Sequence, residues 1–487
     1  MTVAVALPSL SLSSDEHAVL DELTVQLARF RPENQVKADY YDGKSRLEDL
    51  RIALPPTLAG LAVAVGWPAA AVDCVEERLD FEGWNTAATN ASGDDPFGLE
   101  ELYLANDLDV ESIKAHLDAL IYGVGFAAVT TGFDGEPDPL VTVESPLNMT
   151  ATIDSRTRRV TSAYMQRLDV EDRIVTGALF LPNETIWLEN KSPSLSSPSG
   201  WTVIERDQHR LGQVAVAAFV NQSKSGSPRG HSEITETVRR LTQSGLRTLA
   251  NAELAREYYA APQRFVLGAR ESFFTDADGN PMPAWKSYLG RMLALERDEY
   301  GDLPDVKEFR GQSLETFFGM MKMYAQLLSG HIGIPQNYLG FSTDNPPSAE
   351  AINAMEFRLV KRAERRQRQF GGGWTQLSRL AIMVREGSSD LPKEAMLIRP
   401  KWRPAHTPTM ASAADATTKL IAAGVLPAES TVTWDRLDIS RVEQKQLKAD
   451  LRKQTVSQLV SNLGSAPAPS EAASAAVGQR GEGTVEG

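Results

Sequence analysis

The stretch Ser313-Leu-Glu-Thr-Phe-Phe-Gly-Met-Met-Lys-Met-Tyr-Ala-Gln-Leu-Leu-Ser-Gly-His-Ile-Gly-Ile-Pro335 decides most of what can be predicted about this fold. Its apolar residues recur at steps of three and four, which is typical of one face of an amphipathic helix; they are Leu314, Phe317, Phe318, Met321, Tyr324 and Leu328. Ser313 can cap the start of this helix. Gly330 and Gly333 can adopt the left-handed conformation that ends a helix, and Pro335 prevents its continuation.

A second and much longer helix is predicted to begin after Ser348 and to continue to about residue 385. Its apolar positions are Ile352, Met355, Leu359, Ala363, Phe370, Trp374, Leu377 and Ala381. The triple glycine at 371–373 costs about 1 kcal/mol per residue relative to alanine, which predicts a kink or a break in the helix. Between the two helices, residues 340–347 contain turn formers and no apolar period, which predicts an exposed loop.

The rest of the chain predicts an α+β protein that is mainly helical. Helical periods occur at 15–31, at 57–80 with an interruption at 66–68, and at 109–123. Runs typical of strands lie at 126–131, 140–143, 157–168, 173–181 and 185–188. Together they predict a sheet-bearing region over about 124–220.

The helical period returns from Ser232, a candidate cap, to about Ala260, and an irregular insert follows at 262–311. Beyond Pro404, a helix over about 410–421 should stop at Gly424, and a capping box at 440–443 should open another. From residue 465 the composition predicts disorder.

Composition limits the class of protein. With 487 residues, 42% of them hydrophobic and 23% charged, the chain resembles ordinary soluble proteins of more than one domain. It has no run of eighteen apolar residues, so we expect no membrane span, and its first twelve residues lack the basic start of a secretory signal. The single cysteine, Cys74, excludes an internal disulfide and suits a reducing cytoplasm.

The net charge of −14 argues against tight binding of DNA through bulk attraction. A protein that grips duplex DNA needs a basic surface, because phosphate neutralisation and counterion release supply most of that affinity. The six histidines are never spaced as metal ligands, and we expect no metal site, no cofactor and no catalytic residue.

The order of these features resembles the portal proteins of tailed bacteriophages, specifically the Gp6-like family of the SPP1 type. Besides the opening stretch, the resemblance covers residues 38–455 through four segments: Tyr40-Tyr41-Asp42-Gly43-Lys44, Val72 to Leu79 with Glu82-Gly83-Trp84, Pro408 to Leu420, and Gly424-Val425-Leu426-Pro427. It implies a portal fold with wing, stem, clip and crown regions, assembled as a ring.

On this resemblance, the chain divides into eight regions. They are N-terminal helices and a β-rich wing (1–230), a first stem helix (231–261), a clip (262–311), a second stem helix (312–332), a tunnel loop (333–348), a long kinked wing helix with a following strand (349–404), a helical crown (405–463) and a disordered tail (464–487).

The implied function is that of a portal protein, which forms the DNA channel at one capsid vertex, receives the terminase during packaging and lets DNA leave at ejection. The implied partners are a homo-oligomeric ring, usually of twelve subunits, the terminase large subunit, a head-completion adaptor, the major capsid and scaffolding proteins, and double-stranded DNA that is weakly contacted. The implied location is the virion vertex, with the host cytoplasm during assembly.

Two surfaces follow from the resemblance. The DNA-facing tunnel loop would present Phe341, Ser342, Thr343, Asp344 and Asn345, and its lack of lysine or arginine limits DNA contact to weak, replaceable interactions. The clip would present an acidic docking surface for the terminase and the adaptor, formed by Glu296, Asp298, Glu299, Asp302, Asp305 and Glu308.

A basic stripe runs along the long helix of this acidic protein, formed by Arg358, Arg362, Arg365 and Arg368 with Lys361 and Arg366 beside it. Three interpretations remain open from the sequence: ion pairs with neighbouring subunits, which we favour, a solvated face, or contact with DNA.

An alternative function from a different class is a capsid-associated, metal-dependent nuclease or hydrolase. Its carboxylates would come from distant positions around the sheet, such as Asp134, Glu144 and Asp154. Nothing in their spacing pairs them, and surface turns account for them more simply.

Overall fold

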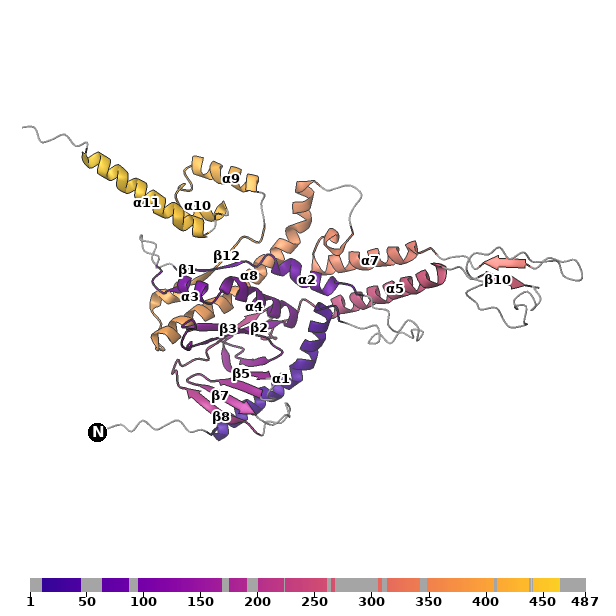
Figure 1. The fold of residues 1–487 in the computed structure, drawn as a ribbon, viewed down its shortest axis with the longest axis horizontal. Coiled ribbons are helices and arrows are strands. Elements are labelled where there is room, and N and C mark those ends of the chain that lie inside the picture. The colour runs from indigo at the N-terminus through magenta and orange to yellow at the C-terminus, as the bar shows by residue number, and fades with distance from the viewer. Residues whose placement is uncertain are drawn as a thin grey trace, which may run out of the picture. The chain divides into compact units, whose positions relative to one another are not determined.

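The computed structural model describes residues 11–44, 64–86, 95–168, 175–190, 200–222, 224–260, 264–267, 305–308, 313–341, 348–406, 410–437, 439 and 441–464 (Figure 1). These residues belong to two compact units, Met1–Ala405 and His406–Gly487. Both helices and strands are well represented, which confirms the predicted α+β class. In the described part, no helix is both long and apolar enough to cross a membrane.

The helices of the first unit are α1 (Ser14–Tyr41), α2 (Trp67–Glu76), α3 (Leu99–Ala105), α4 (Leu108–Tyr122), α5 (Glu236–Ala260), α7 (Glu315–Ile332) and α8 (Ala349–Glu386), with short 3₁₀ turns at Gln336–Leu339 and Lys393–Leu397. Its strands are β1 (Phe81–Asn85), β2 (Val124–Thr130), β3 (Leu140–Glu144), β4 (Met149–Ile153), β5 (Val160–Leu168), β6 (Val175–Phe180), β7 (Thr185–Asn190), β8 (Thr202–Asp207), β9 (Val216–Val220), β10 (Arg264–Leu267), β11 (Asp305–Glu308) and β12 (Arg399–Trp402). The sheet-bearing region at 124–220 is therefore confirmed, with β4, β8 and β9 added to it.

Two antiparallel sheets form the centre of this unit, one of five strands in the order β4-β5-β6-β7-β8 and one of three in the order β3-β2-β9. Alternate residues of β2 point to different layers. Phe126 and Ala128 pack against the five-stranded sheet, while Ala127 and Val129 join the main core with α4 and α8. Because both faces of β2 are covered, its sequence is an almost continuous apolar run.

Helix α1 covers the other face of the five-stranded sheet with Leu20, Leu23 and Leu27 (Figure 1). A capping box between Ser13 and Glu16 fixes its start. The predicted end near residue 31 is wrong, because the helix continues through Pro32 to Tyr41. Tertiary contacts hold this extension: the amide of Asn34, for example, donates to the carbonyl of Pro146.

Helices α5 and α7 lie side by side and run antiparallel (Figure 1). The start of α5 meets the end of α7, where Thr235 and His331 share a hydrogen bond of 3.2 Å. Gly333 ends α7 in the left-handed conformation, with φ of 70°, as predicted. The predicted cap at Ser232 is wrong: the backbone N–H of Val238 donates to Thr235, whereas Ser232 lies four residues before the helix begins.

Helix α8 has 38 residues and is capped by Ser348, as predicted, whose hydroxyl accepts from the backbone N–H of Ala351. It is helical throughout the triple glycine, so a break is absent there, while the alternative of a kink stays a prediction. The glycines permit close packing instead: a Cβ on Gly373 would lie 2.7 Å from the ring of Phe219. Next to it, Trp374 is fully buried and stacks on Phe81 with ring centroids 4.2 Å apart.

The second unit contains α9 (Met410–Ala422), α10 (Thr431–Arg436) and α11 (Arg441–Gly464). Gly424, with φ of 69°, ends the region of α9 as predicted. Helix α10, which begins after the cap residue Ser430 and buries Trp434, was not predicted. The predicted capping residue Ser440 and the tail from residue 465 lie outside the described residues.

Candidate functional site

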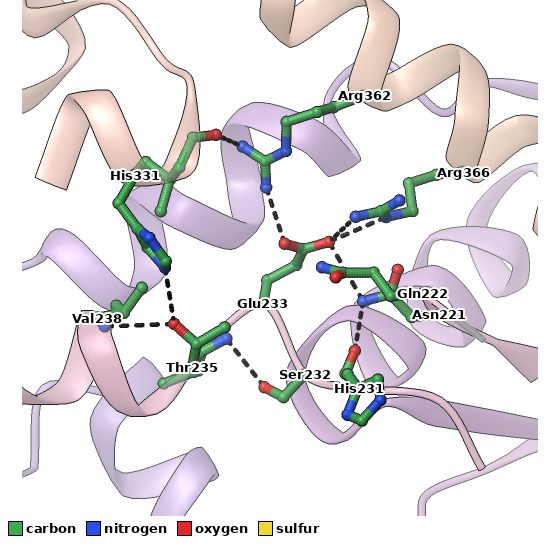
Figure 2. Close-up of polar contacts among 12 residues, drawn as sticks. Asn221, Gln222, His231, Ser232, Glu233, Thr235, Val238, His331, Arg362 and Arg366 are labelled. Atoms are coloured by element: carbon green, nitrogen blue, oxygen red, sulfur yellow. Dashed lines mark hydrogen bonds and ion pairs between the residues drawn. The ribbon is translucent and has the colours of Figure 1, made fainter. Parts of the chain in front are cut away.

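The most distinctive polar site in the described part of the chain is centred on Glu233, in the segment between β9 and α5 (Figure 2). The side chain of Glu233 is only 4% exposed, and it binds Arg362 and Arg366, which are one turn apart on α8. One carboxylate oxygen lies 2.8 Å from Arg362, and the other accepts two hydrogen bonds from Arg366, at 2.9 and 2.6 Å. We call this group the Glu233 junction.

The junction joins the segment between β9 and α5 to α7 and α8, which lie much later in the sequence (Figure 2). Arg362 also donates to the carbonyl of Ile332, the last residue of α7. Asn221, next to the end of β9, donates a hydrogen bond of 3.2 Å to Glu233 and one of 2.8 Å to the carbonyl of His231. The junction therefore fixes the adjacent ends of α5 and α7 to α8 and to the three-stranded sheet.

Electrostatics favour the charged form of this carboxylate. Burial alone would raise the pKa of Glu233, but the attraction of Arg362 and Arg366 outweighs it and holds the pKa below its usual value. Burial also lowers the pKa of Arg362. Because Glu233 and Arg366 are buried, loss of one charge would leave another buried charge poorly compensated.

The predicted basic stripe is divided by these contacts. Arg362 forms an ion pair with Glu233 of the same chain, and Arg358 donates a hydrogen bond of 2.7 Å to the carbonyl of Gly330. Arg365 is exposed, and Arg368, 74% exposed, lies 3.6 Å from Glu364 of its own helix. Arg366, which the sequence placed only beside the stripe, is the most buried of these arginines.

Sequence reasoning missed Glu233. The signal available was an acidic residue next to the apolar residue that opens a helical period, together with arginines at a spacing of four on another helix. Neither pattern says that the two segments meet, because nearly 130 residues separate them. Only the tertiary structure, in which the segment before α5 lies against α8, brings the charges together.

The other predicted surfaces fall mostly outside the described residues. Phe341 is half-buried and packs against the main core. The rest of the predicted tunnel-loop set, Ser342, Thr343, Asp344 and Asn345, lies outside the described residues, as do Glu296, Asp298, Glu299 and Asp302 of the predicted clip surface. Asp305 and Glu308 lie on β11, which pairs with β10. The docking and DNA-contact roles of both sets stay predictions.

The carboxylates of the alternative nuclease are used separately. Asp154 accepts from backbone N–H groups of its own turn, Glu144 is buried and paired with Arg167, and Asp134 is exposed in another turn. Among the described residues, no group of three or more potential metal ligands comes together. Cys74 is half-buried, and burial raises the pKa of its thiol to about 11, which disfavours the reactive thiolate.

Comparison with known proteins identifies the class. Residues 20–457 match the family described as phage portal protein, SPP1 Gp6-like. The chain is 31% identical over 435 residues to the portal protein of Mycobacterium phage L5, covering 87% of this chain and 86% of that protein. It is 30% identical over 437 residues to the portal protein of Mycobacterium phage D29, with the same coverage.

These matches assign the chain to the phage portal proteins. Within that class it belongs to the SPP1 Gp6-like portal family, as the order of its sequence features predicted.

Proposed function

We propose that this chain forms the ring-shaped DNA channel at one vertex of a phage capsid. Membership of the portal family supports this function, and the observation that carries it is the antiparallel pair of α5 and α7, held at its base by the Glu233 junction. In this assignment the pair is the stem, residues 262–311 are the clip, and residues 333–348 are the tunnel loop. The β-rich region and α8 form the wing, and residues 405–463 form the crown.

Exposed apolar residues on α7 support association of stems in a ring. Phe318 is 69% exposed, Leu327 55% and Met323 47%, on a helix whose other side packs on α5. Several large apolar side chains exposed on one helix are unfavourable in water, and exposed apolar surface is typical of protein interfaces. The two neighbouring stems in a ring would cover them.

The remaining partners follow from position in the channel. The acidic residues of the clip would receive the terminase during packaging and the head-completion adaptor afterwards. The tunnel loop would touch DNA only weakly, since it has no basic residue. On α8, Arg358, Arg365 and Arg368 are the members of the basic stripe that remain exposed for ion pairs with a neighbouring subunit.

Electron microscopy of the purified chain tests the assembly. We expect rings with a central hole, usually of twelve subunits. A compact monomer that persists at high protein concentration would refute the proposal. Double replacement of Phe318 and Leu327 by serine should reduce the yield of rings and leave the circular dichroism spectrum of the subunit unchanged, because both side chains are exposed.

A further inference from the structure

A concave pocket of about 660 Å³ lies beside the Glu233 junction, along α8 and next to the end of α7. Its lining has one carboxylate, Glu233, and five cationic side chains: Arg358, Lys361, Arg362, Arg365 and Arg366. Five positive charges against one negative charge leave an excess of four. Glu364, which binds Lys361 at 2.7 Å from outside the lining, reduces the excess to three. The pocket is thus strongly positive in a chain whose net charge is −14.

The contacts inside the chain do not use up these positive charges. Glu233 supplies one negative charge to two arginines. Arg358 binds a neutral carbonyl, and Arg365 is exposed and has no hydrogen bond or ion pair with any described residue. Burial lowers the pKa of Arg362, and Arg366 and Arg358 lower it further, although Glu233 acts in the opposite direction. An anion in the pocket would relieve this repulsion.

We propose that the pocket binds an oligophosphate, a small ligand with two or three linked phosphate groups. A terminal phosphate carries about 1.5 to 2 negative charges at neutral pH, so two phosphates roughly match the excess of three or four. Guanidinium groups bind phosphate oxygens in pairs through parallel hydrogen bonds. The pocket volume also lies within the range of about 300 to 1,000 Å³ that is usual for small-molecule sites.

Two other anions fit less well. A single carboxylate from a neighbouring subunit would leave at least two of the excess positive charges uncompensated. Duplex DNA would extend well beyond the pocket and meet a chain whose net charge is −14, which opposes its approach. The exposed ring of Phe357, 63% accessible at the pocket, adds a surface on which a nucleobase can stack, so a nucleotide is one source of the phosphates.

Isothermal titration calorimetry on the full-length protein, at fixed ionic strength, tests the proposal with inorganic tripolyphosphate and with ATP. We expect saturable binding at one site per chain. Arg365→Ala and Arg358→Ala should each weaken it about tenfold, because each removes a charge-assisted hydrogen bond. Arg368→Ala is the matched control: it removes an exposed arginine from the same helix but outside the pocket, and it should leave the affinity unchanged.

The two ligands distinguish the sources of the phosphates. Equal affinity for both would mean that only phosphate is recognised, whereas tighter binding of ATP that is lost in Phe357→Ala would identify a nucleotide. The proposal fails if neither ligand shows saturable binding, or if Arg368→Ala weakens binding as much as Arg365→Ala. The proposal also fails if the pocket arginines become buried only when rings form and tripolyphosphate does not compete with ring formation. Binding is measured whether or not rings form, so this result is independent of the channel function.

Discussion

Replacing Glu233 by glutamine tests the Glu233 junction directly. The substitution keeps the shape of the side chain but removes the charge that Arg362 and Arg366 share at 2.6 to 2.9 Å. These arginines are 15% and 8% exposed, so water only partly replaces the lost partner. Breaking a buried ion pair in this way costs about 3 to 5 kcal/mol, and we expect the free energy of unfolding of the first unit to fall by that amount.

The comparison variant is Glu364→Gln, which removes a carboxylate from the same region of α8. Glu364 binds Lys361 and Arg368, whose side chains are 48% and 74% exposed, and exposed pairs contribute less than about 1 kcal/mol. Urea unfolding followed by circular dichroism measures both variants. Hydrogen exchange should also show faster opening at the start of α5 and the end of α7 in Glu233→Gln alone.

The pH dependence gives a second readout. Because the pKa of Glu233 is lower in the folded chain than in the unfolded chain, its charge stabilises the fold above the unfolded value of 4.5. This stabilisation is lost as the pH falls through the folded value. The difference between wild type and Glu233→Gln should therefore be full at pH 7 and shrink on acidification. Equal destabilisation by Glu233→Gln and Glu364→Gln at pH 7 would refute the reasoning.

Three further predictions concern packing, assembly and titration. Gly373→Ala should destabilise the fold by about 1 to 3 kcal/mol, because its Cβ would meet the ring of Phe219 at 2.7 Å. Gly372 faces open space, so Gly372→Ala should be neutral or stabilising by up to about 1 kcal/mol. Thermal unfolding of both variants separates the effect of packing from that of helix propensity. Gly319→Leu should leave the stability of the subunit unchanged, since no atom lies within 4 Å of its Cβ position. If neighbouring stems approach each other at Gly319, the substitution should reduce the yield of rings in electron micrographs. An unchanged yield would contradict a close approach of stems at this position. Burial and nearby carboxylates raise the pKa of Glu76 to about 7, so ionisation of Glu76 opposes folding above the unfolded pKa of 4.5. Glu76→Gln should therefore stabilise the chain by about 1 to 2 kcal/mol at pH 8 and have no effect at pH 4. Equal effects at both pH values in urea unfolding would refute the assignment.

Local patterns were enough for most of the elements. The three-and-four period found α4, α5, α7 and α8, and Ser348 and Gly333 set helix ends, because capping depends on a few adjacent residues. The errors occurred where distant contacts override local preference. Helix α1 passes through Pro32 because its second half packs on other elements, and the glycine run does not interrupt α8, where β12 lies close to Gly371 and β9 lies close to Gly373.

The sequence by itself determined the α+β class, the family and the order of the helices and strands, since these depend on periodicity, caps and turns along the chain. The tertiary structure decided which charges meet. Glu233 and the arginines of α8 are too far apart in sequence for any spacing rule to relate them, and the same packing hollows the pocket beside them. A stripe of arginines that looked uniform is therefore divided into buried members that hold α5 and α7 on α8 and exposed members that remain available to a ligand or a neighbouring subunit.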